Sequence, residues 1–168
     1  ILLHFSTDEV YGDIDGGDHI ETDILKPSNP YSATKAAADM LIKAWQRTYD
    51  IPYVIIRPTN NYGTHQYHEK LIPISVRCLQ RGRKIRLHNQ GEPYRNWLHS
   101  EDTADAVITV IERGSRNEIY NISGGFEQKN KETVKHIIEN YFDSNVDWEE
   151  YVDFDHIRQG QDVRYAVN

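Results

Sequence analysis

Short apolar runs alternate with longer stretches of helical periodicity along the chain. The apolar runs predict strands at residues 1–6, 51–56, 85–87 and 118–123. Apolar residues recur at helical spacing over residues 30–48, 69–81, 100–113 and 130–141. The run at 51–56 is continuously apolar, which is typical of a strand covered on both faces. Strand–helix alternation of this kind predicts an α/β fold with a parallel sheet.

Residues with strong positional preferences mark the ends of these helices. Asn29-Pro30 offers an N-cap followed by proline at the first helical position, so a helix of about five turns is expected behind it. Residues 13–28, rich in Gly, Asp and Pro, are predicted to form a loop. The other predicted boundaries are Ser100 and Asn130 as N-caps, with Gly82 and Gly114 as stops.

Composition and charge exclude several classes of protein. The 168 residues carry 26 acidic and 19 basic side chains, a formal charge of −7, so no general affinity for nucleic acid or anionic lipid is expected. A single cysteine, Cys78, excludes an internal disulfide. No apolar run reaches the length of a membrane span, and we expect a cytoplasmic protein. The chain opens at Ile1 within a predicted strand, which predicts an interior piece of a longer protein.

Tyr31 and Lys35 form the sharpest candidate for chemistry. They stand at i and i+4 near the start of the first long helix and therefore share a face. An ammonium beside a phenol is expected to lower the phenol's pKa, so that Tyr31 could accept a proton from a hydroxyl while a hydride leaves the same carbon. The same stretch also contains Ser32-x-x-Lys35, the pattern of an acylating serine, as a weaker alternative.

A second candidate, residues 6–12 (STDEVYG), follows directly after the first predicted strand. Ligands of parallel α/β sheets bind beyond the carboxyl ends of the strands. Asp8 and Glu9 could divide the roles of acid and base there if their surroundings separate their pKa values; an acidic, solvated loop is the alternative. His65, His68 and Glu69 lack a further ligand at a known spacing, so no metal site is expected.

These stretches carry a resemblance to a known family. The chain resembles the extended short-chain dehydrogenase/reductase superfamily and, within it, the nucleoside-diphosphate-glucose 4,6-dehydratases, with dTDP-glucose as the expected substrate. The matching stretches run in family order at residues 6–12 (STDEVYG), 27–36 (PSNPYSATKA), 57–63 (RPTNNYG), 69–73 (EKLIP), 95–98 (RNWL), 101–102 (ED), 120–122 (YNI) and 164–166 (RYA).

The resemblance implies a role for each residue of the two candidates. Tyr31 would take the 4-hydroxyl proton as NAD⁺ takes the C4 hydride, and Lys35 would hold the cofactor's ribose and tune Tyr31. Thr7 would hydrogen-bond to the 4-hydroxyl. Glu9 would remove the C5 proton and Asp8 would protonate the departing C6 hydroxyl. The hydride would then return to C6, giving a 4-keto-6-deoxy sugar with no net redox change.

The resemblance also implies where the nucleoside-diphosphate part of the substrate binds. The implied substrate-binding residues are Asn60, Lys70, Leu71, Arg95, Asn121, Arg158 and Tyr165. Three positions depart from the usual family pattern: Arg86 and His88, where Pro and Tyr are more common, and Gln161, where a histidine contact is usual. These departures leave the choice between thymine and uracil open. Homodimer formation is implied as well, through helices that include the one bearing Tyr31.

The expected organisation is a partial Rossmann-like parallel sheet with a smaller C-terminal α/β region. Residues from about 1 to 63 would be the C-terminal half of an NAD-binding domain, and those from about 64 to 168 mostly the sugar-nucleotide region. The glycine-rich turn that receives the NAD pyrophosphate is absent from the sequence, so we expect the chain alone to be inactive. The alternatives are a UDP-sugar dehydratase, a UDP-glucuronate decarboxylase, a non-catalytic sugar-nucleotide-binding fragment, and a split protein whose other chain supplies the missing half.

Overall fold

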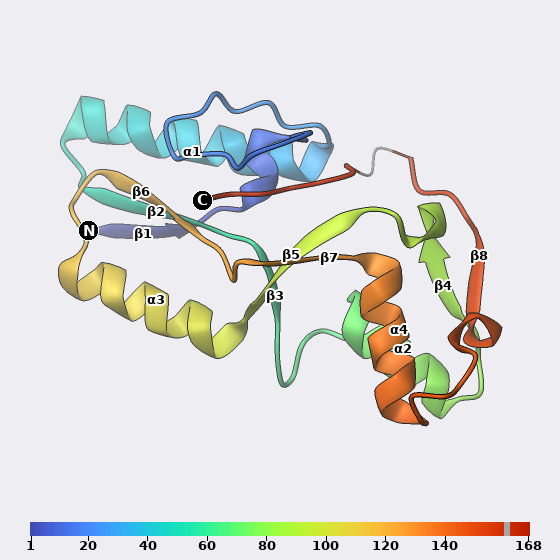
Figure 1. Ribbon diagram of the computed structural model, residues 1–168. Helices are drawn as coiled ribbons and strands as arrows, with labels where there is room; N and C mark the ends of the chain where they lie inside the picture. The colour runs from blue at the N-terminus through green and yellow to red at the C-terminus, as the bar shows by residue number, and fades with distance from the viewer. Residues whose placement is uncertain (160–161) are drawn as a thin grey trace.

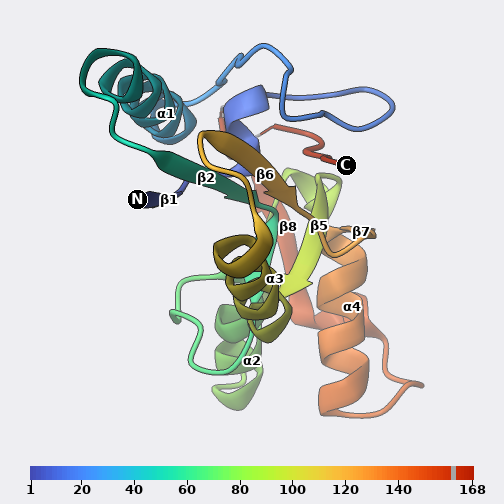
Figure 2. The ribbon, with the colours of Figure 1, turned by 90° about the vertical axis from the view of Figure 1, so that its left-hand side faces the viewer.

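A parallel three-stranded sheet lies between two helices at one end of the molecule (Figure 1). In this computed structural model, which describes residues 1–159 and 162–168, the strands are β1 (Leu2–Phe5), β2 (Tyr53–Pro58) and β6 (Glu118–Ile122), in the order β1-β2-β6. Helix α1 (Pro30–Tyr49) lies on one side of the sheet and α3 (Ser100–Arg113) on the other (Figures 1 and 2). The predicted α/β fold with parallel strands is confirmed.

The start of α1 is fixed by the residues that predicted it. Asn29 Oδ1 accepts a hydrogen bond from the Ser32 amide at 2.9 Å, and the Ser32 hydroxyl donates to the Asn29 carbonyl at 3.1 Å. Pro30 occupies the first helical position, where its missing N–H costs nothing. Ser32 is fully buried in these contacts, so its hydroxyl is not available as a nucleophile and the acylating-serine alternative is wrong.

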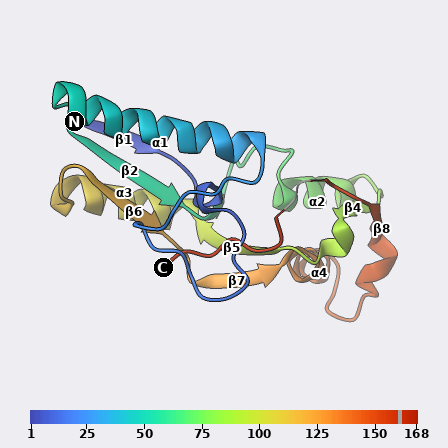
Figure 3. The ribbon, with the colours of Figure 1, turned by 90° about the horizontal axis from the view of Figure 1, so that it is seen from above.

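The second half of the chain adds a smaller α/β region (Figures 1 and 3). One sheet pairs β3 (Asn60–Tyr62) in parallel with β5 (Tyr94–His99), and β5 antiparallel with β7 (Phe126–Lys129). A second pairs β4 (Ile85–His88) with β8 (Val152–His156) in parallel. Helices α2 (Leu71–Gln80) and α4 (Asn130–Tyr141) share a core with β4 and β8. Three 3-10 turns complete the described elements: η1 (Asp8–Tyr11), η2 (Asn89–Gly91) and η3 (Trp148–Tyr151).

Two predicted helix caps are displaced by one residue. His99 rather than Ser100 is the N-cap of α3, because His99 Nδ1 accepts a hydrogen bond from the Glu101 amide at 3.3 Å. Asn130 is the first residue of α4, and the preceding Lys129 amide donates to Glu132 Oε2 at 3.1 Å. Gly114 ends α3 as predicted, with its amide donating to the Val110 carbonyl at 2.8 Å.

The first sheet takes strands and helices from both halves of the chain. Strand β6 and helix α3 belong to the second half of the sequence, yet they pack against β2 in a core that includes Val54 and Ile56. The predicted division into an NAD-binding half and a sugar-nucleotide region near residue 63 stays a prediction. On α1 only Ser32, Ala36 and Asp39 are buried. Several of its large apolar side chains, among them Met40 and Trp45, are exposed. No helix among the described residues is long and apolar enough to cross a membrane.

Candidate active site

An open cleft of about 1720 Å³ runs from the carboxyl ends of β1 and β2 into the smaller α/β region. Ligands of parallel sheets bind at this edge. The cleft brings together most of the residues singled out from the sequence: Thr7, Asp8, Glu9, Tyr31, Asn60, Lys70, Leu71, Arg95, Arg158 and Tyr165. Lys35 and Asn121 are not among its lining residues. Gln161 lies outside the described residues.

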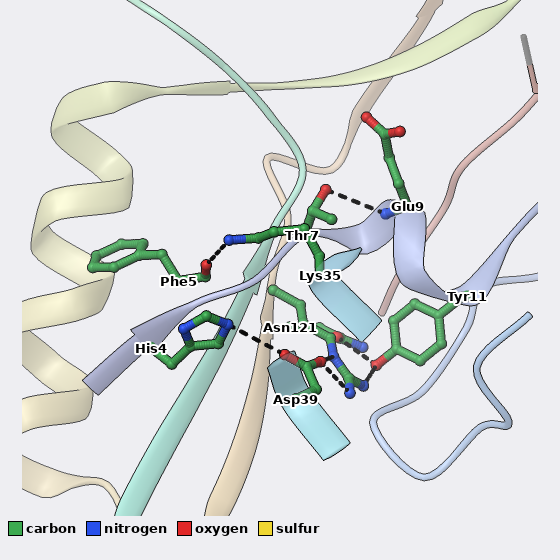
Figure 4. Close-up of polar contacts among 9 residues, drawn as sticks. His4, Phe5, Thr7, Glu9, Tyr11, Lys35, Asp39 and Asn121 are labelled. Carbon is green, nitrogen blue, oxygen red and sulfur yellow. Dashed lines mark hydrogen bonds and ion pairs between the residues drawn. The ribbon is translucent and has the colours of Figure 1, made fainter. Parts of the chain in front are cut away.

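The turn η1 holds the two adjacent carboxyls at the end of β1. The Ser6 amide donates to the Ile56 carbonyl at 2.7 Å and fixes the strand end to β2. Thr7 caps the turn, because its Oγ1 accepts from the Glu9 amide at 3.3 Å (Figure 4). Gly12 closes the turn at a φ of +84°, and a side chain there would meet the Lys26 carbonyl oxygen at 2.4 Å. Only glycine fits this position.

Asp8 is buried with little compensation for a negative charge. Burial raises the pKa of its carboxyl to about 7, and the neighbouring Glu9 charge adds to the rise. The Thr7 hydroxyl, which donates to Asp8 Oδ1 at 3.1 Å, and the Arg95 charge oppose it only partly. Asp8 Oδ2 is buried without a hydrogen-bond partner among the described residues. A carboxyl of this kind can hold a proton near neutral pH and donate it.

Glu9 lies in more polar surroundings than Asp8. Asn29 Nδ2 and the Tyr165 hydroxyl both lie 3.4 Å from Glu9 Oε2. The Tyr165 hydroxyl donates to the Asp162 carboxylate, which also accepts from the Ser28 hydroxyl. Burial and these carboxylates raise the pKa of Tyr165. Two adjacent carboxyls with different partners provide the asymmetry that a separate acid and base require.

Tyr31 and Lys35 do not form the pair expected from their spacing. Burial raises the pKa of Tyr31, and the Glu9 and Asp8 charges add to the rise, so the expected lowering by Lys35 is wrong for this structure. Lys35 Nζ instead donates to the Phe5 carbonyl at 2.5 Å (Figure 4). The amides of Leu2 and Ser6 bond to β2. By strand alternation the Phe5 carbonyl therefore faces the other, unpaired edge of β1, where Lys35 satisfies it.

Buried polar atoms without partners mark the floor of the cleft. Ser6 Oγ, Thr59 Oγ1 and Asn60 Oδ1 have no hydrogen-bond partner among the described residues. All three residues line the cleft, at the ends of β1 and β2. Since buried polar groups in proteins are nearly always paired, this arrangement favours a polar ligand at the strand ends. The residues present therefore fit a ligand, such as a nucleotide cofactor, that lies across the sheet edge.

The far end of the cleft is rich in cations. Its lining there includes the cations Arg83, Lys84, Arg86 and Arg158, with the imidazole of His88 among them. Burial, Arg158 and the nearby His156 lower the pKa of His88. In a chain with a formal charge of −7, this concentration of positive charge favours an anionic ligand such as a diphosphate. Within residues 1–159 and 162–168, no group of three or more His, Cys, Asp or Glu could hold a metal ion.

Asn121 takes part in a buried polar cluster that sequence reasoning missed. Its Oδ1 accepts from the Tyr11 hydroxyl at 2.9 Å, and its Nδ2 donates to the His19 carbonyl at 3.3 Å. The Tyr11 hydroxyl in turn accepts from Arg57, which is paired with Asp39 on α1. The sequence does offer a hint of this cluster, because Asp39 and Arg57 each lie among apolar residues. Asp and Arg side chains are rarely buried in proteins unless they are paired.

The fold and the site define an α/β protein with a ligand cleft at the edge of a parallel sheet. Sequence comparison identifies its class. The profile of the NAD dependent epimerase/dehydratase family matches residues 1–123, and the chain belongs to this family. It is 41% identical over 167 residues to the low-salt glycan biosynthesis protein Agl12 of Haloferax volcanii, covering 99% of this chain and 53% of that protein. It is 42% identical over 174 residues to a dTDP-glucose 4,6-dehydratase of Neisseria gonorrhoeae, covering 98% and 50%.

A solved relative matches the structure closely. The crystal structure of a dTDP-glucose 4,6-dehydratase from Streptomyces venezuelae, with NAD and TYD bound, has a TM-score of 0.93 and 38% identity. The match covers 99% of this chain and 50% of that one. The chain thus spans about half the length of the relatives that it matches.

Proposed function

We propose that the chain is the catalytic and substrate-binding part of an NAD-dependent dehydratase that converts a nucleoside-diphosphate-glucose, with dTDP-glucose as the preferred substrate, into its 4-keto-6-deoxy sugar. The observation that carries the proposal is the pair Asp8-Glu9 in the cleft beside Tyr31. Asp8 is buried with a pKa raised to about 7, whereas Glu9 contacts polar groups. An elimination of water needs one carboxyl that gives a proton and one that takes a proton.

NAD⁺, when bound, supplies the acceptor for the C4 hydride and later the donor for C6. Tyr31 takes the proton of the 4-hydroxyl, and Thr7 orients that hydroxyl by a hydrogen bond. Lys35 is the residue that would hold the ribose of the cofactor. Its ammonium has three N–H donors and gives one to the Phe5 carbonyl at 2.5 Å here, which leaves two for the ribose. Placed beside the phenol, its positive charge would favour the phenolate.

The elimination itself falls to the two carboxyls of turn η1. Once C4 is a ketone, the proton on C5 is acidified and Glu9 removes it. Asp8 then donates its proton to the C6 hydroxyl, which leaves as water. The raised pKa of Asp8 suits this step, because a carboxyl with its ordinary pKa of 3.8 would be almost fully ionised at neutral pH.

The substrate's nucleoside diphosphate is proposed to lie along the cationic end of the cleft. Arg95 and Arg158 would pair with the phosphates, since a guanidinium can bind phosphate oxygens with two hydrogen bonds. Asn60, Lys70, Leu71 and Tyr165 line the same cleft and complete the proposed subsite. Arg86 and His88 would face the base, which leaves uracil nucleotides as the competing substrates.

We also propose a cytoplasmic homodimer. The supporting observation is the apolar side chains that α1 leaves in solvent: Met40 and Leu41 are 60% exposed and Trp45 is 54% exposed. An apolar helix face of this kind is typical of a surface covered by another protein. The same helix bears Tyr31 and Lys35, so the dimer would lie next to the active site.

The proposal is tested by offering the complete protein three substrates: dTDP-glucose, UDP-glucose and UDP-glucuronate. NMR should detect a new methyl group and a ketone with dTDP-glucose, and a lower kcat/KM with UDP-glucose. A faster reaction of UDP-glucose would change the nucleotide assignment. Carbon dioxide released from UDP-glucuronate, without conversion of either glucose substrate, would replace the dehydratase with a decarboxylase.

A further inference from the structure

A buried chain of polar contacts joins the turn that carries Asp8 and Glu9 to the helix that carries Tyr31 (Figure 4). Arg57 on β2 donates from Nε and Nη2 to Asp39 Oδ2, at 3.0 and 2.8 Å, and from Nη1 to the Tyr11 hydroxyl at 2.6 Å. The Tyr11 hydroxyl donates onward to Asn121 Oδ1 at 2.9 Å. We call these four residues, Tyr11, Asp39, Arg57 and Asn121, the Arg57 network.

The two ends of the network lie on the two elements that bear the reacting groups. Asp39 follows Tyr31 by eight residues and Lys35 by four on α1, so it anchors the helix about 12 Å along its axis from Tyr31. Tyr11 follows Glu9 by two residues within η1. Arg57 stands between them on β2, and Asn121 adds β6. The network therefore fixes η1 relative to α1.

The backbone of η1 is held by few short hydrogen bonds. The Val10 amide lies 3.4 Å from the Thr7 carbonyl, beyond the usual range, and the Gly12 amide lies 3.2 Å from the Glu9 carbonyl, at its upper end. Val10 packs in one core cluster with Ala36 of α1, and its carbonyl accepts from the Lys26 amide at 3.1 Å. The side chain of Tyr11 adds the polar attachment. It is 1% exposed, its ring stacks on His19 at 4.9 Å, and its hydroxyl lies between Arg57 and Asn121.

The directions of the hydrogen bonds leave Tyr11 one arrangement. Arg57 can only donate, so the hydroxyl oxygen accepts from it and the single hydroxyl proton goes to Asn121 Oδ1. The Asn121 amide cannot turn without loss, because its Nδ2 donates to the His19 carbonyl at 3.3 Å. Each group is thus oriented by the next one.

We propose that Tyr11 is a positioning residue of the reaction: its hydroxyl, held by Arg57 and Asn121, sets the orientation of η1 so that Asp8 and Glu9 face the same substrate carbons as Tyr31. The inference rests on the proposed function and deepens it. It also gives Asn121 a positioning role through Tyr11; the substrate contact that the resemblance implied for Asn121 stays a prediction. Tyr11 does not line the cleft.

The test is Tyr11→Phe in the complete protein, with Tyr120→Phe as the matched control. Phe keeps the ring that stacks on His19 and removes only the hydroxyl. Tyr120 lies on β6 and does not line the cleft. Its hydroxyl accepts a hydrogen bond from the Ser115 amide at 2.7 Å, so Tyr120→Phe also removes a hydroxyl that is hydrogen-bonded. For Tyr11→Phe, kcat with dTDP-glucose should fall about 10- to 100-fold, while KM stays within roughly twofold. The control should change neither.

Hydrogen–deuterium exchange gives a readout that does not depend on activity. In Tyr11→Phe, amides of residues 8–12 should exchange faster while those of 33–49 keep their rates. Equal kcat and equal exchange in Tyr11→Phe and Tyr120→Phe would overturn the inference. If Tyr11→Phe does not fold, Asn121→Ala is the second variant. It removes the acceptor of the Tyr11 hydroxyl but leaves Arg57 paired with Asp39 and Tyr11. Amides of residues 8–12 should again exchange faster while those of 33–49 keep their rates. If the wild type does not dehydrate its substrate, the proposed function fails, and exchange still decides whether Tyr11 holds η1.

Discussion

Replacing Asp8 with Asn should make the protein more stable and almost inactive. The carboxyl is 3% exposed, and its pKa is raised from 3.8 to about 7. A rise of this size corresponds to about 4 kcal/mol by which the folded state disfavours the ionised form. Asn is neutral at every pH, has nearly the same shape, and can still accept the hydrogen bond that Thr7 donates.

The sign of the pH dependence follows from the two pKa values. Well below pH 4 the carboxyl is protonated in both the folded and the unfolded chain, and Asp8→Asn should change the free energy of unfolding little. Between about pH 4 and 7 the unfolded chain has released the proton while the folded chain keeps it, so the wild type loses stability as the pH rises. Above pH 7 the variant should be more stable by up to about 4 kcal/mol.

Urea denaturation of the complete protein between pH 4 and 9 measures this difference. Asp105→Asn, at an exposed position on α3, is the matched control and should follow the wild type. Over the same range Asp8→Asn should lose about 10²- to 10⁴-fold in kcat, because an amide cannot protonate the leaving hydroxyl. A variant that gained no stability at pH 8 relative to pH 4, or that kept its activity, would refute the assignment of Asp8 as a buried acid.

Three further outcomes are expected in the complete protein. Glu9→Gln should block exchange of the C5 proton with deuterated solvent and lower kcat by about 10²- to 10⁴-fold, while C4 oxidation in a single turnover, followed as absorbance of the reduced cofactor, persists; continued C5 exchange would argue for another base. Arg57→Leu should cost about 3–5 kcal/mol in urea denaturation, since the buried Asp39 carboxylate would keep only His4 Nε2, 3.5 Å away, as a partner, and Arg57→Leu with Asp39→Leu should cost less; equal losses would mean that the pair is not coupled. Trp45→Glu should shift a dimer toward monomer in light scattering, whereas Ser144→Glu, far along the chain from α1, should not; a dimer that tolerates the charge at Trp45 would move the interface elsewhere.

Local sequence rules predicted the elements that are defined by their own residues. Helix α1 follows from Asn29-Pro30 at its start and from its long helical periodicity. Strand β2 follows from a continuous apolar run that is buried on both faces. The sequence does not predict strands β3, β5, β7 and β8. They are rich in charged and amide side chains and are specified by pairing partners that are distant in the sequence.

The sequence predicted which residues belong to the candidate site, but not which atoms those residues contact. The family resemblance implied that Asp8, Glu9 and Tyr31 share a site, and all three line one cleft. Helical spacing alone could not predict that Lys35 would bond to the Phe5 carbonyl, because that depends on the unpaired edge of β1. Nor could it predict the contacts of Asn121. The side-chain amide of Asn121 bonds to the Tyr11 hydroxyl and to the His19 carbonyl, which lie about a hundred residues earlier in the sequence.

The proposed dehydratase oxidises C4, eliminates water across C5 and C6, and returns the hydride to C6. Turnover of dTDP-glucose by the complete protein in deuterated water, followed simultaneously by NMR and by absorbance of the reduced cofactor, tests all three steps together. We expect a 4-keto-6-deoxy product with one solvent deuterium at C5 and no net formation of NADH. Steady accumulation of NADH together with a product that retains its C6 hydroxyl would show that the protein is a simple dehydrogenase.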